Sequence, residues 1–247
     1  MLPDSSVSRI TAAVILAGGL GTRLRSEVPD LPKPMAPVAG CPFLEHLIGY
    51  WLKQGITHFV LSVGYRHETI SGYFGAEFLG ARIDYVVEET PLGTGGGLLL
   101  AAQTLPQDQR FLLLNGDTYF AVKLSVLTDF AVSLNADWCF SLFRAQEAGR
   151  YMGIDLAPDG RIQSLKSGTG RPGRLANGGV YVIHPRGIAK SAFAPGGRAS
   201  LEDDIFETAL QTGQTMVGLE CDGRFIDIGI PADYRRASQV IRLKRTQ

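Results

Sequence analysis

The sequence predicts an α/β protein in which helices flank a mostly parallel central sheet. Short apolar runs that suit buried strands alternate with amphipathic helical patterns, and glycine-bearing turns separate them. The 247 residues are 45% hydrophobic and 19% charged, which provides the apolar material for one core. We therefore expect a single domain over 1–247, with a first half at about 10–135 and a second half at about 136–247 that share one sheet.

The first half reads as strands and helices that alternate along the chain. Residues 12–17 form an apolar run typical of a strand that is buried on both faces. Residues 42–55 predict a helix, and Gly55 suits its end. Its apolar residues share one helical face: Phe43, Leu44, Leu47, Ile48, Trp51 and Leu52. The further expected elements are strands at 58–63, 82–89 and 110–117, and helices at 67–75 and 96–105.

The second half is richer in strand patterns. The expected elements are strands at 137–145 and 177–183, a hairpin at 153–165, and helices at 200–213 and 231–245. The hairpin turns at Pro158-Asp159-Gly160, a combination that favours a tight turn. Pro231 lies near the start of the last helix, where proline is tolerated. We therefore expect a small β-rich part that is followed by a C-terminal helix.

Composition and charge exclude several classes of protein. The 24 basic and 24 acidic residues give a formal net charge of zero, so bulk attraction to nucleic acid or to an anionic membrane is not expected. Cys41, Cys139 and Cys221 are far apart, which disfavours a disulfide framework and a zinc site. Residues 1–10 lack the basic and apolar regions of a signal peptide, and no apolar run is long enough to span a bilayer. We expect a cytoplasmic protein.

The stretch "LAGGLGTRL" at 16–24 follows the first expected strand, where a parallel sheet binds its ligands. Its glycines let the backbone approach a ligand and offer N–H groups to phosphate oxygens. Leu24 stands where a dinucleotide fingerprint has its third glycine, and the loop does not end in the Gly-Lys-Ser/Thr of a Walker motif. Arg23 offers a planar fork suited to pyrophosphate, and Lys33 is held between two prolines. The stretch predicts a phosphate site of another type, although a glycine turn with surface charges is the alternative on this segment alone.

Five segments, in order, resemble the signature of the sugar-1-phosphate nucleotidyltransferases. They are "LAGGLGTRL" with "LPKP", "PLGTGGGL" (91–98), "NGDT" (115–118), "NGGVY" (177–181) and "FIDIGIPADY" (225–234). The resemblance covers nearly the whole chain, and it implies a Rossmann-like nucleotidyltransferase fold in which a nucleotide-binding half precedes a sugar-binding half. Within the family, "GLGTRLRSEVPDLPKPMAPVAGCPFLEHL" looks most like the D-glycero-α-D-manno-heptose 1-phosphate guanylyltransferases.

The resemblance implies a transfer reaction without an enzyme nucleophile. An oxygen of the sugar phosphate attacks the α-phosphorus of a nucleoside triphosphate and pyrophosphate leaves, so the catalyst must neutralise charge and hold geometry. By resemblance Asp117 and Asp227 hold Mg²⁺, the implied cofactor, which prefers one or two carboxylates plus phosphate oxygens. By resemblance also, Arg23 holds the triphosphate and the leaving pyrophosphate, and Lys33 contacts the phosphates at the reacting centre. A strand-end aspartate without a metal is the alternative for each carboxylate.

The resemblance places the base against backbone of the glycine loop and of the segment 93–94. The expected nucleotide-binding residues are Leu16, Ala17, Gly18, Gly19, Gly21, Thr22, Arg23, Glu88, Gly93 and Thr94. Backbone donors and acceptors can read a base edge, and glycine lets the base pack closely. Glu88 or its neighbour Glu89 can accept hydrogen bonds from a guanine N1–H and amino group, and a solvated strand-end pair is the alternative.

The residues expected to bind the sugar phosphate are Lys166, Asn177, Gly178 and Glu202, and a surface lysine on the hairpin is the alternative for Lys166. The family often carries Glu-Lys-Pro before this point, and the matching stretch here is "QSLKSG". Leu165 stands in place of the glutamate and Ser167 in place of the proline, which removes one expected sugar contact. "SLEDDIF" also reads as a helix start that Ser200 caps, with Asp203 three residues on, so a Glu202 that faces the sugar is one of two interpretations.

The expected substrates are GTP and D-glycero-α-D-manno-heptose 1-phosphate, with no nucleic-acid or membrane partner and with a homo-oligomer left open. Mannose-1-phosphate guanylyltransferases, and thymidylyl- or uridylyltransferases for other sugar 1-phosphates, are rivals within the family. A non-catalytic nucleotide-sugar sensor is a second class. Loss of any one of four residues would favour it, and all four are present: Arg23, Lys33, Asp117 and Asp227. The missing third glycine disfavours a third class, the NAD-dependent enzymes.

Overall fold

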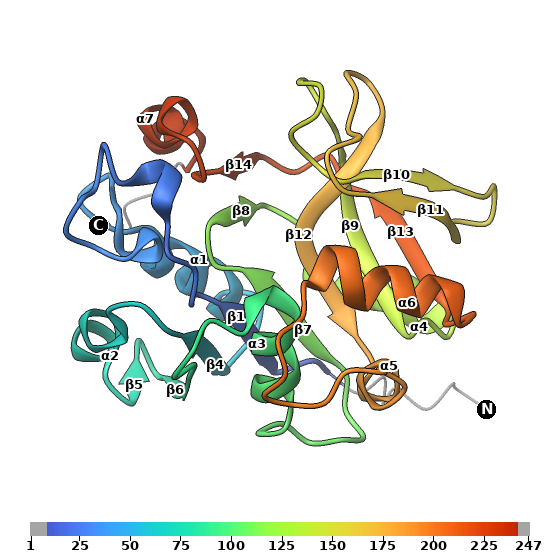
Figure 1. Cartoon of the computed structure of the whole chain (residues 1–247), viewed down its shortest axis with the longest axis horizontal. Coiled ribbons are helices and arrows are strands. Elements are labelled where there is room, and N and C mark those ends of the chain that lie inside the picture. Colours follow the sequence, from blue (N-terminus) through green and yellow to red (C-terminus); the bar gives the residue numbers. More distant parts are fainter. Residues whose placement is uncertain (1–8, 242–247) are drawn as a thin grey trace.

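The computed structural model of the chain describes residues 9–241, and a ten-stranded sheet forms its centre (Figure 1). The strands of this sheet are β1 (Ala12–Leu16), β4 (His58–Val63), β5 (Glu77–Phe78), β6 (Ala81–Val87), β7 (Phe111–Asn115), β9 (Trp138–Arg144), β10 (Gly153–Leu156), β11 (Ile162–Lys166), β12 (Leu175–Ile183) and β13 (Met216–Glu220). Two small pairs lie outside it: β2 (Pro37–Val38) with β3 (Cys41–Pro42), and β8 (Thr118–Phe120) with β14 (Phe225–Asp227).

Helices and single turns connect these strands. They are η1 (Thr22–Leu24), η2 (Lys33–Met35), α1 (Phe43–Leu52), α2 (His67–Phe74), α3 (Gly93–Ala102), α4 (Leu124–Ser133), α5 (Pro185–Ala189), the π-helical turn η3 (Leu201–Phe206), α6 (Glu207–Gln211) and α7 (Pro231–Val240). The predicted α/β class with a mostly parallel sheet is confirmed.

The strand order is β11-β10-β12-β7-β1-β4-β6-β5, with β9 between β12 and β13. Strands β7, β1, β4 and β6 are parallel to one another, so their carboxyl ends lie at the same edge. Strand β12 pairs antiparallel with β7 and β9, and this pairing joins the two halves of the sequence in one sheet, as predicted.

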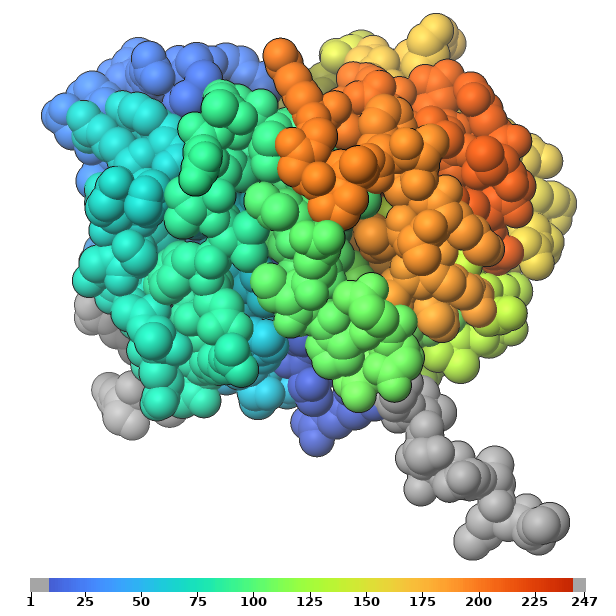
Figure 2. All heavy atoms as spheres, turned by 60° about the horizontal axis from the view of Figure 1, so that its bottom comes forward, coloured from blue at the N-terminus to red at the C-terminus, as the bar shows by residue number. Residues whose placement is uncertain are grey.

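The central strands are buried on both faces, because helices cover each side. Side chains alternate along a strand, so Ala13 and Ile15 of β1 pack into one core cluster while Val14 packs into the other. The first cluster includes residues of α1, α2 and α4, and the second includes residues of α3, η3 and α6. In Figure 2 the orange segment that leads into η3 lies against the green residues around α3, which contact η3.

A third cluster brings the C-terminal helix to the glycine-rich segment. Ile226 and Ala237, from β14 and α7, pack with Leu24 and Val28 of the first half. Figure 1 shows α7 above the blue N-terminal segments, far from the strands β9–β13 that precede it in the chain. The end of the described chain therefore returns to the loop that begins the site.

Several elements differ from the sequence-based expectation. Strands β8 and β13 and helices α4 and α5 were not predicted, and the helix expected at 200–213 divides into η3 and α6. Helix α3 begins at Gly93, three residues before the predicted start, because glycines hide the helical pattern of its first turn. Helix α7 ends at Val240, and the predicted continuation over 242–245 lies outside the described residues.

Candidate active site

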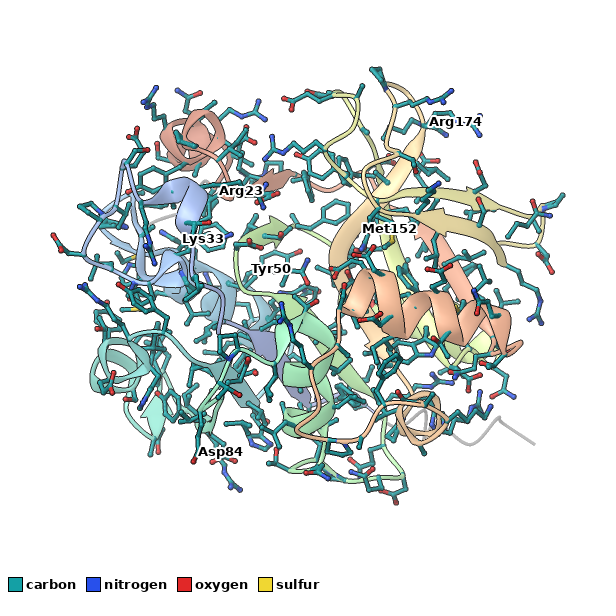
Figure 3. The ribbon with its side chains drawn as sticks, viewed as in Figure 1. Arg23, Lys33, Tyr50, Asp84, Met152 and Arg174 are labelled. Atoms are coloured by element: carbon teal, nitrogen blue, oxygen red, sulfur yellow. The ribbon has the colours of Figure 1, made fainter. Side chains whose placement is uncertain are left out.

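A cavity of about 400 Å³ opens at the carboxyl ends of β1 and β7. Parallel sheets bind ligands at this edge, because the loops that leave neighbouring strands diverge there. The sequence-predicted residues that line the cavity are Leu16, Ala17, Gly18, Gly19, Arg23, Lys33, Glu88, Gly93, Thr94, Asp117 and Glu202. Figure 3 shows Arg23 and Lys33 near each other on the blue segment. Gly21 and Thr22 lie in the same loop and do not line the cavity.

Two glycines allow backbone segments to come together at this cavity. A Cβ on Gly116 would lie 2.4 Å from the carbonyl oxygen of Leu16, so only glycine fits where β1 and β7 end. Gly21 has a positive φ of 59°, and a Cβ there would meet the Cβ of Lys33 at 3.0 Å. Gly21 thus brings the Lys33 segment against the loop without touching the cavity itself.

Lys33 forms an ion pair with Asp117, the residue that follows Gly116. Burial opposes ionisation of this carboxyl, but the adjacent ammonium outweighs it and holds the pKa of Asp117 below its ordinary value. The structure therefore places a cation and a carboxylate from distant segments at the junction of β7 and β8.

Asp227 lies beside Asp117, because β14 pairs antiparallel with β8 in a register that places Asp227 opposite Thr118. The amide of Gly229 donates to Asp227 Oδ1 at 2.6 Å, and the amide of Ile228 donates to the Asp117 carbonyl at 2.9 Å. Burial, followed by repulsion from the Asp117 carboxylate, raises the pKa of Asp227 to about 6.

Two carboxylates that repel each other in a partly buried site suit a divalent cation. Residues 9–241 contain no group of three or more histidine, cysteine or acidic side chains arranged to hold a metal ion. A site built on Asp117 and Asp227 alone leaves other coordination positions to phosphate oxygens and water, which is the arrangement that Mg²⁺ prefers. The donor set therefore fits the magnesium ion expected from the sequence.

Glu88 faces the cavity and its neighbour Glu89 is exposed, which settles the orientation that the sequence left open. The Ser62 hydroxyl donates to Glu88 Oε1 at 2.8 Å, and the amide of Leu92 donates to Oε2 at 3.1 Å. Each carboxylate oxygen can accept more than one hydrogen bond, so the pinned side chain still offers acceptors to a ligand.

A second cavity of about 220 Å³ adjoins the first on the side of β12, and we call it the sugar-side cavity after the sugar-binding half expected from the sequence. Its lining residues are Asn115, Asp117, Thr118, Arg150, Tyr151, Met152, Ser167, Gly168, Asn177, Gly178, Gly179, Glu202, Phe225 and Asp227. Asn177 is fixed by its own hydrogen bonds, because its Nδ2 donates to the Tyr181 hydroxyl at 2.7 Å and its Oδ1 accepts from the Gly179 amide at 3.1 Å.

Glu202 lines both cavities and connects the two halves of the chain. The Thr94 hydroxyl, from the first turn of α3, donates to Glu202 Oε2 at 3.0 Å. Burial raises the pKa of the Glu202 carboxyl. Ser200 caps η3, the turn that carries Glu202, as predicted, and its hydroxyl oxygen accepts from the Asp203 amide at 3.1 Å. The Ser200 amide donates to Asp204 Oδ2 at 2.7 Å and not to Asp203, because the wider spacing of this π-helical turn accommodates an extra residue.

Lys166 lies apart from the other predicted site residues. It is exposed at the end of β11 and lines a separate hollow with Arg171 and Arg174. Figure 3 shows Arg174 at the outer side of the second half, away from Arg23 and Lys33. The preceding Leu165 packs against a core cluster, and successive strand residues face opposite sides, so Lys166 points elsewhere while Ser167 reaches the sugar-side cavity.

The family model described as Nucleotidyl transferase matches residues 12–243, nearly the whole chain. The chain belongs to the nucleotidyl transferase family. The resemblance inferred from the five motifs is thereby confirmed.

Relatives and solved structures agree with this assignment. The chain is 40% identical over 228 residues to the D-glycero-alpha-D-manno-heptose 1-phosphate guanylyltransferase of Aneurinibacillus thermoaerophilus, covering 92% of this chain and 96% of that protein. The enzyme of the same name from Campylobacter jejuni is 38% identical, with 90% and 96% covered. HddC from Yersinia pseudotuberculosis has a related structure, with a TM-score of 0.81, 31% identity, and 94% and 100% covered.

Two features of the site in this nucleotidyltransferase were not predicted from its sequence. Arg150 lines the sugar-side cavity, but nothing in "AQEAGRYMG" distinguishes it from a surface arginine. Ser62 holds Glu88 across two neighbouring strands, a pairing that appears only once β4 and β6 are aligned.

Among residues 9–241, no helix has the length and apolar character needed to cross a membrane.

Proposed function

We propose that this chain transfers a guanylyl group from GTP to D-glycero-α-D-manno-heptose 1-phosphate, giving GDP-heptose and pyrophosphate. Two relatives that carry this activity in their names are 40% and 38% identical, and 96% of each is covered. HddC has also been solved complexed with GMP-PN, with a TM-score of 0.80, which favours a guanine nucleotide. In this proposal the half at about 10–135 binds the nucleotide, and the half at about 136–247 binds the sugar.

The observation that carries the proposal is that two cavities share one wall. Three residues line both the first cavity, at the carboxyl ends of β1 and β7, and the sugar-side cavity: Asn115, Asp117 and Glu202. A triphosphate in the first and a sugar phosphate in the second would meet at this wall, which is the arrangement that an in-line transfer requires. A sensor that holds only the product does not need a cation and two carboxylates at the meeting point.

On the nucleotide side, the backbone of Leu16 to Gly19 and of Gly93 and Thr94 would hold the base and ribose. Glu88 would accept from guanine N1–H and the amino group, because it faces the cavity with both oxygens pinned. Gly21 and Thr22 would shape the loop. Arg23 and Lys33 would bind the triphosphate, and they would neutralise the charge that develops on the leaving pyrophosphate.

On the sugar side, Asn177, Gly178 and Glu202 would surround the sugar. Gly178 lets β12 pack closely, because a Cβ there would lie 2.5 Å from the Phe120 ring and 2.8 Å from the Ser141 carbonyl oxygen. Glu202 can accept from sugar hydroxyl groups. A heptose carries one more hydroxylated carbon than mannose, so it offers one more hydroxyl group to this cavity. The outward position of Lys166 gives it no role in this proposal.

Asp117 and Asp227 would hold Mg²⁺. The bound metal would polarise a phosphoryl oxygen and neutralise charge where the two phosphates meet. The attacking oxygen of a sugar phosphate is already ionised at neutral pH, so no side chain has to remove a proton. Cys41, Cys139 and Cys221 are all free thiols, which fits the reducing cytoplasm that we propose as its compartment. A homo-oligomer is compatible with this mechanism.

A matrix of four nucleoside triphosphates against the heptose, mannose and glucose 1-phosphates tests the proposal by pyrophosphate release. We expect the highest kcat/KM for GTP with the heptose. A site that hydrogen-bonds the extra hydroxyl leaves its own polar groups unpaired when mannose binds, which costs more than a missing methylene. Faster turnover of mannose 1-phosphate would overturn the sugar assignment. The rival assignment is supported by the mannose-1-phosphate guanylyltransferase of Mycobacterium tuberculosis, which is 35% identical and of which 63% is covered. No pyrophosphate from any pair would favour the sensor.

A further inference from the structure

Arg150 is the one arginine or lysine among the described residues that line the sugar-side cavity. It lies in the segment between β9 and β10, and only 12% of its side chain is exposed. Three carboxylates line the same cavity: Asp117, Glu202 and Asp227. A cation this well shielded from water on an acidic wall requires partners, and its partners indicate what it does.

The guanidinium of Arg150 connects the two ends of the turn between β14 and α7. Its Nη2 donates to the backbone carbonyl of Asp227 at 3.1 Å and lies 3.5 Å from Asp227 Oδ2. Its Nη1 forms an ion pair with Asp233, in the first turn of α7. The plane also lies over the Tyr151 ring, with Cζ 4.9 Å from the centroid. The planar fork is therefore occupied on both sides before any substrate arrives.

Asp233 provides the anchor for this arrangement. Its side chain is only 4% exposed, and it also pairs with Arg236 at 2.6 Å. A buried carboxylate is costly unless it is paired, so the Asp233 contact fixes the Arg150 side chain firmly. Arg150 in turn lies near Oδ2 of Asp227, while the Gly229 amide donates to Oδ1, so each carboxylate oxygen has its own partner.

We propose that Arg150 is a positioning residue that holds the Asp227 carboxylate toward Asp117 and does not itself bind the sugar phosphate. The inference rests on the proposed function, in which Asp227 holds the metal. It assigns to the β9–β10 segment of the sugar half a share in building the metal site. Groups that orient a metal-binding side chain typically change metal affinity or activity by about 10- to 100-fold when they are removed.

Four single variants test this assignment: Arg150→Gln, Arg150→Lys, Asp233→Asn and, as the control, Arg144→Gln. Arg144 pairs with Glu220 at 2.7 Å and is 58% exposed, so it provides an arginine ion pair on the same half away from the cavity. Initial rates are measured with the substrate pair that the wild type uses fastest, while Mg²⁺, nucleotide and sugar phosphate are varied in turn. The test therefore stays valid if the preferred sugar is not the heptose, and a wild type without turnover contradicts the proposed function instead.

We expect Arg150→Gln to lower kcat by about 10- to 100-fold and to raise the Mg²⁺ concentration for half-maximal rate. The KM for the sugar phosphate should stay within about threefold, because the substrate loses no direct contact. Arg150→Lys keeps the charge without the planar fork, so its kcat should lie between those of the wild type and Arg150→Gln. Asp233→Asn should change the rates in the same direction. The double variant that combines Arg150→Gln with Asp233→Asn should have a kcat no lower than that of Arg150→Gln alone, because the two residues act as one unit.

Binding without metal provides a readout that is independent of turnover. Calorimetric titration of the nucleotide and of the sugar phosphate in EDTA should give the same Kd for wild type and Arg150→Gln, within about twofold. A tenfold weaker Kd for the sugar phosphate, an unchanged Mg²⁺ requirement, or a silent Asp233→Asn variant would each overturn the positioning role. Thermal unfolding of every variant checks that it is folded at the assay temperature. If Arg150→Gln is unfolded there, Arg150→Lys replaces it in the test.

Discussion

Lys33 forms an ion pair with Asp117, which lies 84 positions further along the chain. Their segments follow β1 and β7, and parallel pairing of these strands brings the two segments to one edge. Each side chain offsets the charge of the other. In the proposed reaction a phosphate takes Lys33 and a metal takes Asp117, so neither charge is left unpaired when the substrates bind.

The proposed metal site predicts that EDTA abolishes turnover and that added Mg²⁺ restores it. Replacing Asp227 by Asn should leave the fold intact and reduce kcat by orders of magnitude, because stabilisation of transition-state charge worth several kcal/mol is removed. Asp222→Asn is the matched control, since Asp222 is exposed and does not line either cavity. Near-normal activity of Asp227→Asn at saturating Mg²⁺ would contradict the assignment.

The raised pKa of Asp227 predicts a pH-dependent response to magnesium. Its pKa of about 6 lies above the usual value of 3.8, so between these values the folded chain binds more protons than the unfolded chain. Ionisation of Asp227 therefore lowers the stability of the metal-free protein as the pH rises through about 6, and bound Mg²⁺ should offset this loss. We expect Mg²⁺ to raise Tm more at pH 7.5 than at pH 5, and not in Asp227→Asn. An equal gain at both pH values would argue against a metal on this carboxylate.

Arg23 predicts a different kind of loss. Arg23→Lys keeps the charge but removes the planar fork, so two parallel hydrogen bonds to the phosphates are no longer available. We expect kcat/KM for the nucleotide to fall roughly tenfold or more, which corresponds to about 1.4 kcal/mol. Arg25→Lys is the control, because Arg25 stacks on Tyr65 at 5.6 Å and does not line the cavity. Equal values for wild type and Arg23→Lys would mean that backbone amides alone hold the phosphates.

The sequence predicted those parts of the site that a strand end determines. An apolar run followed by glycine and aspartate locates Asp117, because the run has to be a buried strand and its end has to face the ligand edge. Glu88 could not be separated from Glu89 in this way, since only the register between β4 and β6 shows which one meets Ser62. Arg150 could not be predicted at all, because no motif surrounds it and its partner Asp227, 77 positions away, meets it only in the folded chain.

The register of β11 predicts that Lys166 is dispensable. The resemblance implied a phosphate contact for it, but the side chain is exposed beside Arg171 and Arg174 in a separate hollow. We expect Lys166→Ala to keep kcat/KM for the sugar phosphate within about twofold, as surface substitutions usually do. Ser167→Ala is the comparison, because Ser167 lines the sugar-side cavity and its hydroxyl donates to Asp203 at 2.6 Å. A large rise in KM for Lys166→Ala would mean that the hairpin turns inward when substrate binds.

Gly116 predicts where the sheet itself limits the site. A Cβ there would lie 2.4 Å from the Leu16 carbonyl oxygen and 3.1 Å from its carbon, and neither backbone atom can move without shifting the end of β1. Gly116→Ala should therefore lower the free energy of unfolding by about 1–3 kcal/mol, as overpacking of a tight site does.

The control for that substitution is Gly19→Ala in the glycine loop, where a Cβ would meet nothing within 4 Å. Because the added methyl group enters open space, we expect the stability of Gly19→Ala to stay within about 0.5 kcal/mol of wild type. Gly19 lines the cavity, so the same methyl group should still weaken nucleotide binding. Urea unfolding and nucleotide titration of both variants separate the two effects. If Gly116→Ala were as stable as wild type, the close approach of β1 and β7 would not be what requires glycine at this position.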